Sequence, residues 1–221
     1  MIYHHPSYFV RQFCPDALWR KEGTDGSIYL TFDDGPIPES TPWLLETLGR
    51  YNVQATFFVV GNNVRCHPNL FFDIVRYGHD VGNHTFHHLN RLHCTREEYL
   101  TDIRLCDEQI AQCMDMYGMA YPSAPSFFRP PHGLLDRRTS MMLEGKKIVQ
   151  WDVVTRDYSP RMDASGIIEV VKHYSRSGSI ITMHDSLKSI EKLRTALPAC
   201  IELLQERGFV FKKLSDYDLF L

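Results

Sequence analysis

Short apolar segments alternate with amphipathic ones along most of the 221 residues of this chain. The apolar, β-type segments predict strands at residues 27–32, 55–60, 80–83, 127–128, 147–153, 179–183 and 209–212. Segments with apolar residues at helical spacing predict helices at residues 41–51, 69–77, 95–116, 136–143, 164–174 and 191–207. About seven strand-then-helix alternations are typical of a parallel barrel or a doubly wound sheet. The chain length suits one such domain, so the sequence predicts a single-domain α/β fold.

Local signals agree with the predicted helices. Thr95 and Glu98 form the pattern of a capping box at the start of the longest helix, and Gly208 follows the last helix where a glycine usually ends one. Cys106 and Cys113 share one face of the long helix at heptad spacing. The six cysteines include no Cys-x-x-Cys pair, so we predict reduced, mostly buried thiols rather than a zinc finger or a disulfide scaffold.

Polar side chains follow the predicted strands at five places. They are Asp33 and Asp34 after the first strand, His84 and His88 after the third, Arg129 after the fourth, Asp157 after the fifth, and His184 and Asp185 after the sixth. In parallel α/β folds the carboxyl ends of the strands form the rim that carries the active site. An open sheet would string these groups along an edge, whereas a closed barrel brings them together, so we favour a barrel.

Charge and composition exclude some classes of function. The net charge is −3 and the isoelectric point about 6.4, so no strong basic field marks nucleic acid as the main partner. Residues 1–20 contain no continuous apolar stretch, so neither a signal peptide nor membrane insertion is predicted. A cytoplasmic location is the default expectation, with association with the cell envelope as the alternative. The sequence predicts no particular oligomeric state.

The acidic pair and the histidines together supply the ligands of a metal centre. Two imidazoles, from His84 and His88, and one carboxylate, from Asp33 or Asp34, can hold a divalent ion with a position open for water. The second carboxylate is then left to remove a proton. The spacing of four puts both histidines on one face if the segment is helical. Two alternatives stay open here: His84 with His87 as the ligand pair, and a turn-capping role for the acidic pair.

Five motifs in order make the chain resemble the polysaccharide deacetylases of carbohydrate esterase family 4. Thr-Phe-Asp-Asp-Gly stands at residues 31–35, His-Thr-Phe-His-His at residues 84–88 and Arg-Pro-Pro-His-Gly at residues 129–133. The fourth and fifth motifs survive in altered form at residues 154–158 and 182–184. The resemblance implies a distorted (β/α)7 TIM-like barrel formed by residues 27–221, with residues 1–26 as an N-terminal extension packed on it. It also implies one bound divalent ion, with Zn²⁺ preferred and Co²⁺, Ni²⁺ or Mn²⁺ as alternatives.

The resemblance further implies a role for each matching residue. The metal ligands would be Asp34, His84 and His88. Asp33 would act as general base, oriented by Arg129, and His184 as general acid, held by Asp157. The backbone N–H of His132 would stabilise the oxyanion, and the substrate and acyl pocket would include Pro131, Tyr158 and Thr182. His87 would lie at the surface or behind the ligands, and His93 has no assigned role.

Departures from the family pattern fall around the acyl pocket. Tyr158 and Thr182 stand where the family usually has Trp and Leu, Val154 replaces an Asp, and His132 replaces a Tyr. A hydroxyl without a partner in this pocket would disfavour the acetyl methyl group. Weak or atypical activity on simple chitin oligomers is therefore expected.

The implied function is metal-dependent removal of N-acetyl groups from glycans that contain N-acetylglucosamine. This is hydrolysis of a carbon–nitrogen bond other than a peptide bond, and the expected partner is an acetylated glycan. One alternative is hydrolysis of another C–N bond, in a small amide or cyclic imide, or of O-acetyl esters on the same fold. A second alternative is a non-catalytic glycan-binding protein. Such a protein is expected to lose the base or the acid first, and this sequence retains both.

Overall fold

Every pair of named strands is parallel, as the alternating sequence predicts. The computed structural model describes residues 4–12, 14–21, 25–119, 126–143 and 145–216. The strands are β1 (Ser27–Asp34), β2 (Thr56–Val59), β3 (Asp80–Asn83), β4 (Ser126–Phe128), β5 (Lys146–Ile148), β6 (Val153–Val154), β7 (Ile180–His184) and β8 (Val210–Lys212). The helices are α1 (Tyr8–Arg11), α2 (Thr41–Arg50), α3 (Gly61–Cys66), α4 (Pro68–Arg76), α5 (Arg96–Met116), α6 (Arg137–Ser140), α7 (Ala164–Tyr174) and α8 (Ile190–Glu206).

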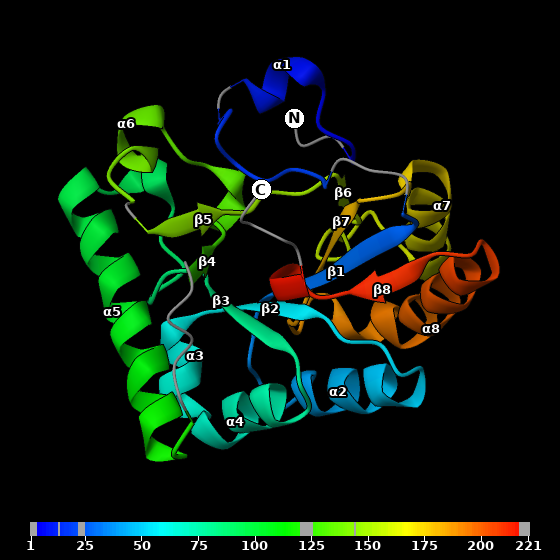
Figure 1. Cartoon of the computed structure of the whole chain (residues 1–221), viewed down its shortest axis with the longest axis horizontal. Coiled ribbons are helices and arrows are strands. Elements are labelled where there is room, and N and C mark those ends of the chain that lie inside the picture. The colour runs from blue at the N-terminus through cyan, green and yellow to red at the C-terminus, as the bar shows by residue number, and fades with distance from the viewer. Residues whose placement is uncertain (1–3, 13, 22–24, 120–125, 144, 217–221) are drawn as a thin grey trace.

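The strands form one sheet in the order β5-β4-β3-β2-β1-β7-β6, and β8 pairs with the start of β1. Figure 1 shows that this sheet is curved and that α5, α3, α4, α2, α8 and α7 surround it on three sides. Parallel strands joined through helices are usually covered on their faces in this way. The arrangement is a parallel half-barrel with its helices outside, which confirms the predicted α/β barrel.

Close packing aligns the first three strands. β1 is buried from Ser27 to Asp33. Phe32 of β1 stacks on Phe57 of β2 with ring centroids 5.1 Å apart. Only glycine fits at Gly82 of β3, because a Cβ there would lie 2.7 Å from the ring of Phe58. The carboxyl ends of these strands therefore lie side by side, and so do the polar residues that they carry.

The long helix α5 begins where the capping box predicts. Oγ1 of Thr95 accepts the N–H of Glu98 at 3.2 Å, and Oε2 of Glu98 accepts the N–H of Thr95 at 2.7 Å. Cys106 and Cys113 lie on its buried face, in agreement with their heptad spacing. All six cysteines are free thiols, of which Cys66 is exposed.

The predicted strand at residues 147–153 is in fact two strands, β5 and β6. The backbone between them bonds to the N-terminal segment: Leu18 donates its N–H to Ile148 and accepts that of Gln150, both at 2.8 Å. Beyond this interruption, Val154 donates its N–H to the carbonyl of His4 at 2.9 Å. The N-terminal segment thus contacts both ends of the sheet, where no pair between β5 and β6 occurs in the described residues.

Two further elements differ from the sequence-based expectation. The predicted strand at residues 55–60 ends at Val59, and a helix that the sequence does not predict, α3, begins at Gly61. A Cβ at Gly61 would lie 2.6 Å from the ring of Phe86, so glycine permits this close approach. The helix predicted at residues 136–143 is only the short α6, which starts after Asp136, whose Oδ1 accepts the N–H of Thr139 at 3.0 Å.

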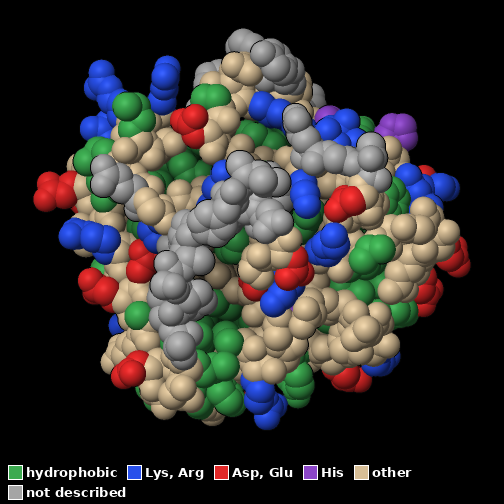
Figure 2. Space-filling view, viewed as in Figure 1, with side chains coloured by type: hydrophobic (Ala, Val, Ile, Leu, Met, Phe, Trp, Pro, Cys, Tyr) green, Lys and Arg blue, Asp and Glu red, His purple; other side chains and the backbone are tan. Residues whose placement is uncertain are grey.

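Within the described ranges, no helix has the length and apolar character needed to cross a membrane. Figure 2 shows acidic and basic side chains interspersed over one face of the molecule.

Candidate active site

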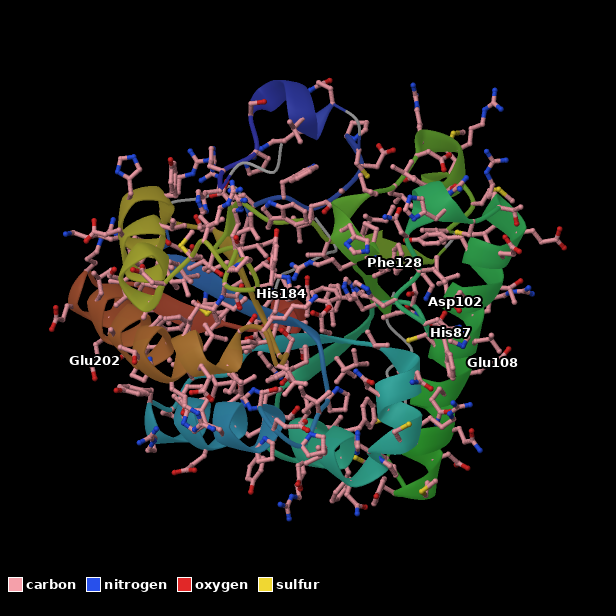
Figure 3. The ribbon with its side chains drawn as sticks, turned by 180° about the vertical axis from the view of Figure 1, so that it is seen from behind. His87, Asp102, Glu108, Phe128, His184 and Glu202 are labelled. Atoms are coloured by element: carbon pink, nitrogen blue, oxygen red, sulfur yellow. The ribbon has the colours of Figure 1, made fainter. Side chains whose placement is uncertain are left out.

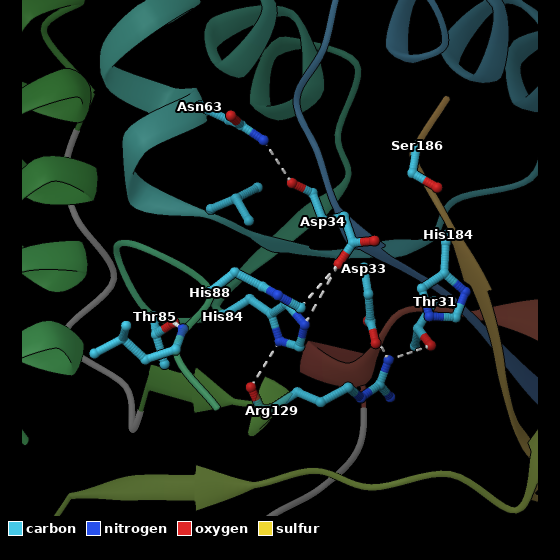
Figure 4. A network of polar contacts seen from close by, with 12 residues as sticks. Thr31, Asp33, Asp34, Asn63, His84, Thr85, His88, Arg129, His184 and Ser186 are labelled. Atoms are coloured by element: carbon cyan, nitrogen blue, oxygen red, sulfur yellow. Dashed lines mark hydrogen bonds and ion pairs between the residues drawn. The ribbon is translucent and has the colours of Figure 1, made fainter. Parts of the chain in front are cut away.

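β1 carries the acidic pair to the rim of the sheet. Asp33 is buried, and its Oδ1 accepts a hydrogen bond from Nη1 of Arg129 at 2.6 Å. Asp34 ends the strand with a φ of 83°, in the left-handed region. Figure 4 shows the carboxylate of Asp33 pointing to Arg129 and that of Asp34 pointing to two imidazoles. The adjacent carboxylates therefore have different surroundings, as a pair with two roles requires.

His84 and His88 meet at Asp34 through a bend between β3 and α5. Their Nε2 atoms lie 3.7 and 3.3 Å from Oδ1 of Asp34, and their ring centroids are 5.0 Å apart. Thr85 has a φ of 62° and His88 a φ of 56°, so this segment is not helical. The condition of a helical segment is therefore not met, and the left-handed residues bring the two rings together instead.

The protonation states of His84 and Asp34 suit a metal ion. Nδ1 of His84 donates to the carbonyl of Arg129 at 2.7 Å, which leaves the Nε2 lone pair facing Asp34. Burial lowers the pKa of His84 to about 4, so this imidazole is neutral near pH 7. Burial opposes ionisation of Asp34, but a hydrogen bond from His88 and the nearby imidazoles hold the pKa of Asp34 below its usual range.

The geometry of the three residues fits a divalent ion. One ligand atom from each of Asp34, His84 and His88 lies within 4.8 Å of the others, and the described residues contain no second group of this kind. Two imidazoles and one carboxylate leave positions free for water and substrate. The alternative pair with His87 is not formed, because Nδ1 of His87 lies 2.6 Å from Oδ1 of Asp102.

Arg129 is completely buried and held from four directions. Its Nη1 donates to Asp33 at 2.6 Å and to Oγ1 of Thr31 at 2.7 Å, and its Nε and Nη2 donate to the backbone carbonyls of Val149 and Gln150. The guanidinium also lies 4.1 Å from the ring centre of Phe58. A guanidinium with its donors fixed in this way can hold the carboxylate of Asp33 in one orientation.

His184 stands across the rim from the metal-ligand group. Its Nδ1 lies 2.8 Å from Oδ1 of Asp157, and its backbone N–H donates to Oδ2 of the same carboxylate at 2.8 Å. Burial opposes the charged imidazole, but Asp157 overcomes this effect and the pKa of His184 rises to about 9. Asp185 points elsewhere: its buried carboxylate accepts hydrogen bonds from Ser40 and Thr41 at the start of α2.

Most of the predicted site residues surround one cavity of about 210 Å³. They are Asp33, Asp34, His84, His88, His132, Tyr158, Thr182 and His184, while Arg129 and Asp157 lie buried behind them. Pro130, rather than the predicted Pro131, lines the cavity. Trp151 and Lys188 are additional lining residues that the motifs do not indicate. The indole of Trp151 packs so closely on Gly133 that a Cβ there would lie 2.2 Å from it.

The acyl pocket differs from its sequence-based description. Oγ1 of Thr182 lies 3.2 Å from Oγ1 of Thr31, so the hydroxyl has a partner inside the barrel. The expectation of an unpartnered hydroxyl is therefore wrong for Thr182, which weakens the reason to expect low activity on chitin oligomers. Tyr158 packs edge-on against His184 with ring centroids 4.7 Å apart.

Three histidines near the site differ in their placement. The ring of His132, which has a φ of 59°, lies 4.8 Å from that of His88. Figure 3 shows His87 beside Asp102 at α5, away from His184. His93 ends a short 3₁₀ turn and is exposed, and it does not line the cavity. Only His132 of the three therefore faces the cavity.

The rim of this parallel half-barrel gathers two imidazoles and a carboxylate that could hold a metal ion, together with a second carboxylate and a charged imidazole, which is the arrangement of a metallohydrolase-type site. Residues 20–148 match the family model described as polysaccharide deacetylase. The chain belongs to the polysaccharide deacetylase family, as the five motifs predict.

Proteins that are similar over most of this chain carry related names. The chain is 36% identical over 202 residues to a chitooligosaccharide deacetylase of Sinorhizobium fredii, covering 85% of this chain and 90% of that protein. It is 38% identical over 161 residues to a peptidoglycan-N-acetylglucosamine deacetylase of Bacillus cereus, covering 72% of this chain and 56% of that protein. These names agree with the expected enzyme class and give no support to a cytoplasmic location.

A solved structure has the same fold. The Bc1960 peptidoglycan N-acetylglucosamine deacetylase, crystallised with 4-naphthalen-1-yl-N-oxidanyl-benzamide, superposes with a TM-score of 0.84 at 31% identity. The match covers 96% of this chain and 95% of that one. Nearly the whole chain, including most of the N-terminal segment, therefore belongs to the shared architecture.

Proposed function

We propose that the protein is a metal-dependent N-deacetylase that acts on glycans containing N-acetylglucosamine. The observation that carries the proposal is the convergence of two carboxylates and four imidazoles on one cavity, with Asp34, His84 and His88 close enough together to share a metal ion. At about 210 Å³ the cavity is smaller than the pockets of roughly 300–1,000 Å³ that enclose drug-sized ligands. It suits one sugar unit with its acetamide, and the rest of the glycan would stay outside. The names of the relatives support this substrate class.

Asp34, His84 and His88 would hold one divalent ion, Zn²⁺ in the first place. When bound, the ion supplies a Lewis acid for the acetamide carbonyl and lowers the pKa of a water molecule. Asp33 lies beside this group but bonds to Arg129 instead, so it is the carboxylate left to accept a proton from the attacking water.

His184 gives the leaving nitrogen its proton. Its raised pKa keeps it charged at neutral pH, and Asp157 holds Nδ1, so Nε2 is the nitrogen free to donate. The backbone N–H of His132 would stabilise the oxyanion. Water adds to the carbonyl carbon, the C–N bond breaks, and acetate and a free amino sugar leave. The proton that Asp33 accepts and the proton that His184 donates balance the step.

The acetyl methyl group would lie against Tyr158 and Thr182. Because the hydroxyl of Thr182 bonds to Thr31, its methyl group remains available to the pocket. The residue change from Leu to Thr therefore shortens the pocket wall without leaving an unsatisfied hydroxyl there.

The test is acetate release from a panel of peptidoglycan, chitin oligomers, acetylxylan and small amides, each with and without a chelator. We expect acetate and free amine from the N-acetylglucosamine glycans, loss of activity with chelator and recovery with Zn²⁺. Preferred turnover of acetylxylan or of small amides would instead favour the esterase or amide-hydrolase alternative. Glycan binding without acetate release would favour the non-catalytic one.

A further inference from the structure

We propose that Lys188 is a specificity-determining residue that binds a carboxylate carried by the glycan next to the acetamido sugar. The proposal rests on the proposed function, because it concerns the substrate of the same cavity. It also separates the two substrate classes for which the relatives are named. Chitooligosaccharides are neutral, whereas the glycan strands of peptidoglycan carry carboxylates.

The position of Lys188 places an ammonium group on the rim of the cavity. Lys188 stands in the turn between β7 and α8, shortly after His184, and it is the one lysine or arginine among the described residues that line the cavity. His132 lines the same cavity, so one substituent of a bound glycan can meet both side chains.

The turn that carries Lys188 is firmly held. The buried carboxylate of Asp185 binds Ser40 and Thr41 on one side, and Ser186 bonds to Ser189 at 3.1 Å on the other. The backbone N–H of Ile190 donates to the carbonyl of Ser186 at 3.1 Å. The flexible stem of Lys188 therefore starts from a fixed backbone position, which limits the region that its ammonium group can reach.

Lys188 differs from the other charged groups around the cavity in having no counterion. Asp33 pairs with Arg129 at 2.6 Å, and His184 pairs with Asp157 at 2.8 Å. The carboxylate of Asp34 faces the metal-binding imidazoles. No hydrogen bond or ion pair within the described part of the chain involves the ammonium of Lys188, whose side chain is exposed. The charge is available to a ligand.

The charge balance of the loaded site favours an anionic substrate. A divalent ion exceeds the single charge of Asp34, and Lys188 adds a second uncompensated positive charge at the rim. A cavity partly screened from water strengthens the attraction of such charges for an anion. A neutral glycan is not attracted by this positive charge. The charge therefore favours an anionic glycan over a neutral one of the same size.

The carboxylate that meets Lys188 has two possible sources, the glycan itself and the acetate product, and we assign it to the glycan. The experiment compares two N-acetylglucosamine–N-acetylmuramic acid oligosaccharides, one with free lactyl carboxylates and one with these groups amidated. They differ only in charge. We expect kcat/KM to be about three- to tenfold higher for the free acid at low ionic strength, as for a partly shielded ion pair. High salt should reduce the preference.

Variants of Lys188 test whether this residue causes the preference for the free-acid glycan. Lys188→Met should bring the ratio of the two kcat/KM values close to one, and Lys188→Arg should retain most of it. The matched control is Lys172→Met, which removes an exposed lysine of α7 and should leave the ratio as in the wild type. Calorimetric binding of both glycans to the Asp33→Asn variant should give the same order of affinities without turnover.

Several results would overturn the proposal. Equal kcat/KM for the two glycans in the wild type would do so, as would an unchanged ratio in Lys188→Met. Relief of acetate inhibition in Lys188→Met with an unchanged ratio would assign the residue to the product instead. Equal turnover of both glycans leaves the proposed function standing, whereas no acetate release from either glycan contradicts the proposed function itself.

Discussion

At the scale of single residues, the site depends on giving identical groups different surroundings. Asp33 and Asp34 are neighbours in sequence, yet one bonds to the buried Arg129 and the other faces His84 and His88. A base must stay free of the metal ion, and a ligand must reach it. The change of direction at Asp34 achieves both, because its left-handed backbone separates the two carboxylates.

The division of labour predicts different losses in two isosteric variants. Asp33→Asn removes the proton acceptor without touching a ligand, so it should keep the metal ion and lose about 10²–10⁴-fold in kcat. Asp34→Asn removes an anionic ligand and should weaken metal binding itself. Elemental analysis and steady-state kinetics on both variants check this, each variant serving as the control for the other. Equal loss of metal from both would contradict the assignment.

The charged state of His184 predicts the alkaline limb of the pH profile. Because the pKa of His184 is raised to about 9, the imidazole carries its proton at neutral pH and loses it as the pH rises through that value. Activity should therefore fall on the alkaline side. Asp157→Asn removes the charge that raises this pKa, so the fall should move to lower pH. An alkaline limb that stays in place in Asp157→Asn would show that His184 is not the acid.

Sequence motifs predict residue identities better than their contacts. The ligand set, the base and the acid stand in local patterns, which is why residues 31–35, 84–88 and 182–184 indicate them. The partner of Thr182 could not be predicted in this way. It is Thr31, which becomes its neighbour only through the register of β1 and β7. Lys188 lies outside any motif and becomes part of the site only because the turn after β7 brings it to the cavity wall.

At the scale of elements, one buried carboxylate of α5 holds the loop of the two histidine ligands. The carboxylate of Asp102 accepts hydrogen bonds from the backbone N–H groups of Phe86 and His87 at 3.0 and 2.9 Å. It also accepts one from Nδ1 of the His87 ring at 2.6 Å. The loop contains left-handed residues that cost free energy, so an external anchor is needed to keep it in place. His87, which is not a ligand, thus contributes to the support of the ligands.

Because Asp102 holds this loop, its substitution is expected to weaken metal binding although no ligand is removed. Asp102→Asn places an amide NH₂ where donors converge, so the loop should loosen and the dissociation constant for Zn²⁺ should rise about 10–100-fold. Competition with a chromophoric chelator measures it. Asp115→Asn, on an exposed position of the same helix, is the matched control. Unchanged affinity in Asp102→Asn would mean that the loop holds its shape unaided.

Far from the cavity, a buried carboxylate that binds the N-terminal segment is expected to stabilise the fold. Asp152 is fully buried and binds Arg11 at 2.6 Å, Arg176 at 3.0 Å and Ser179 at 2.7 Å. Asp152→Ala removes the buried acceptor of these charge-assisted hydrogen bonds, while Arg11 and Arg176 are partly exposed, so the free energy of unfolding should fall by about 2 kcal/mol at pH 7. Urea denaturation measures this. Asp73→Ala, which removes an exposed i,i+3 pair, should change it by less than about 0.5 kcal/mol.

The contacts of Asp152 also predict how the loss of stability in Asp152→Ala depends on pH. Burial opposes ionisation of Asp152, but hydrogen bonds from Arg176, Ser179 and Arg11 hold the pKa of this carboxyl below its ordinary range. A carboxylate with a lowered pKa stabilises the fold above the pKa of the unfolded chain and loses that contribution as the pH falls. The difference between Asp152→Ala and the wild type should therefore shrink as the pH falls below about 4, the ordinary pKa of an aspartate in the unfolded chain. A constant difference down to lower pH would contradict the ionic explanation.

At the scale of the whole molecule, the strand–helix alternation predicts the half-barrel, and the convergence at its rim follows from the parallel strands. What the alternation cannot show is how the sheet ends. The apolar run at residues 147–153 looks continuous, yet it divides where Leu18 bonds to it, because that partner is distant in sequence. Local patterns therefore predict which elements form, whereas contacts between distant segments decide where they break.

The measurement that tests the central claim most directly is acetate release from an N-acetylglucosamine glycan by protein stripped of metal and then reloaded. Elemental analysis must first verify that the metal has been removed. The account predicts no acetate from the stripped protein, recovery when one Zn²⁺ per chain is restored, and no recovery in Asp33→Asn at the same metal content. Full turnover by verified metal-free protein would contradict it, as would the absence of acetate from fully loaded wild-type protein on every N-acetylated glycan.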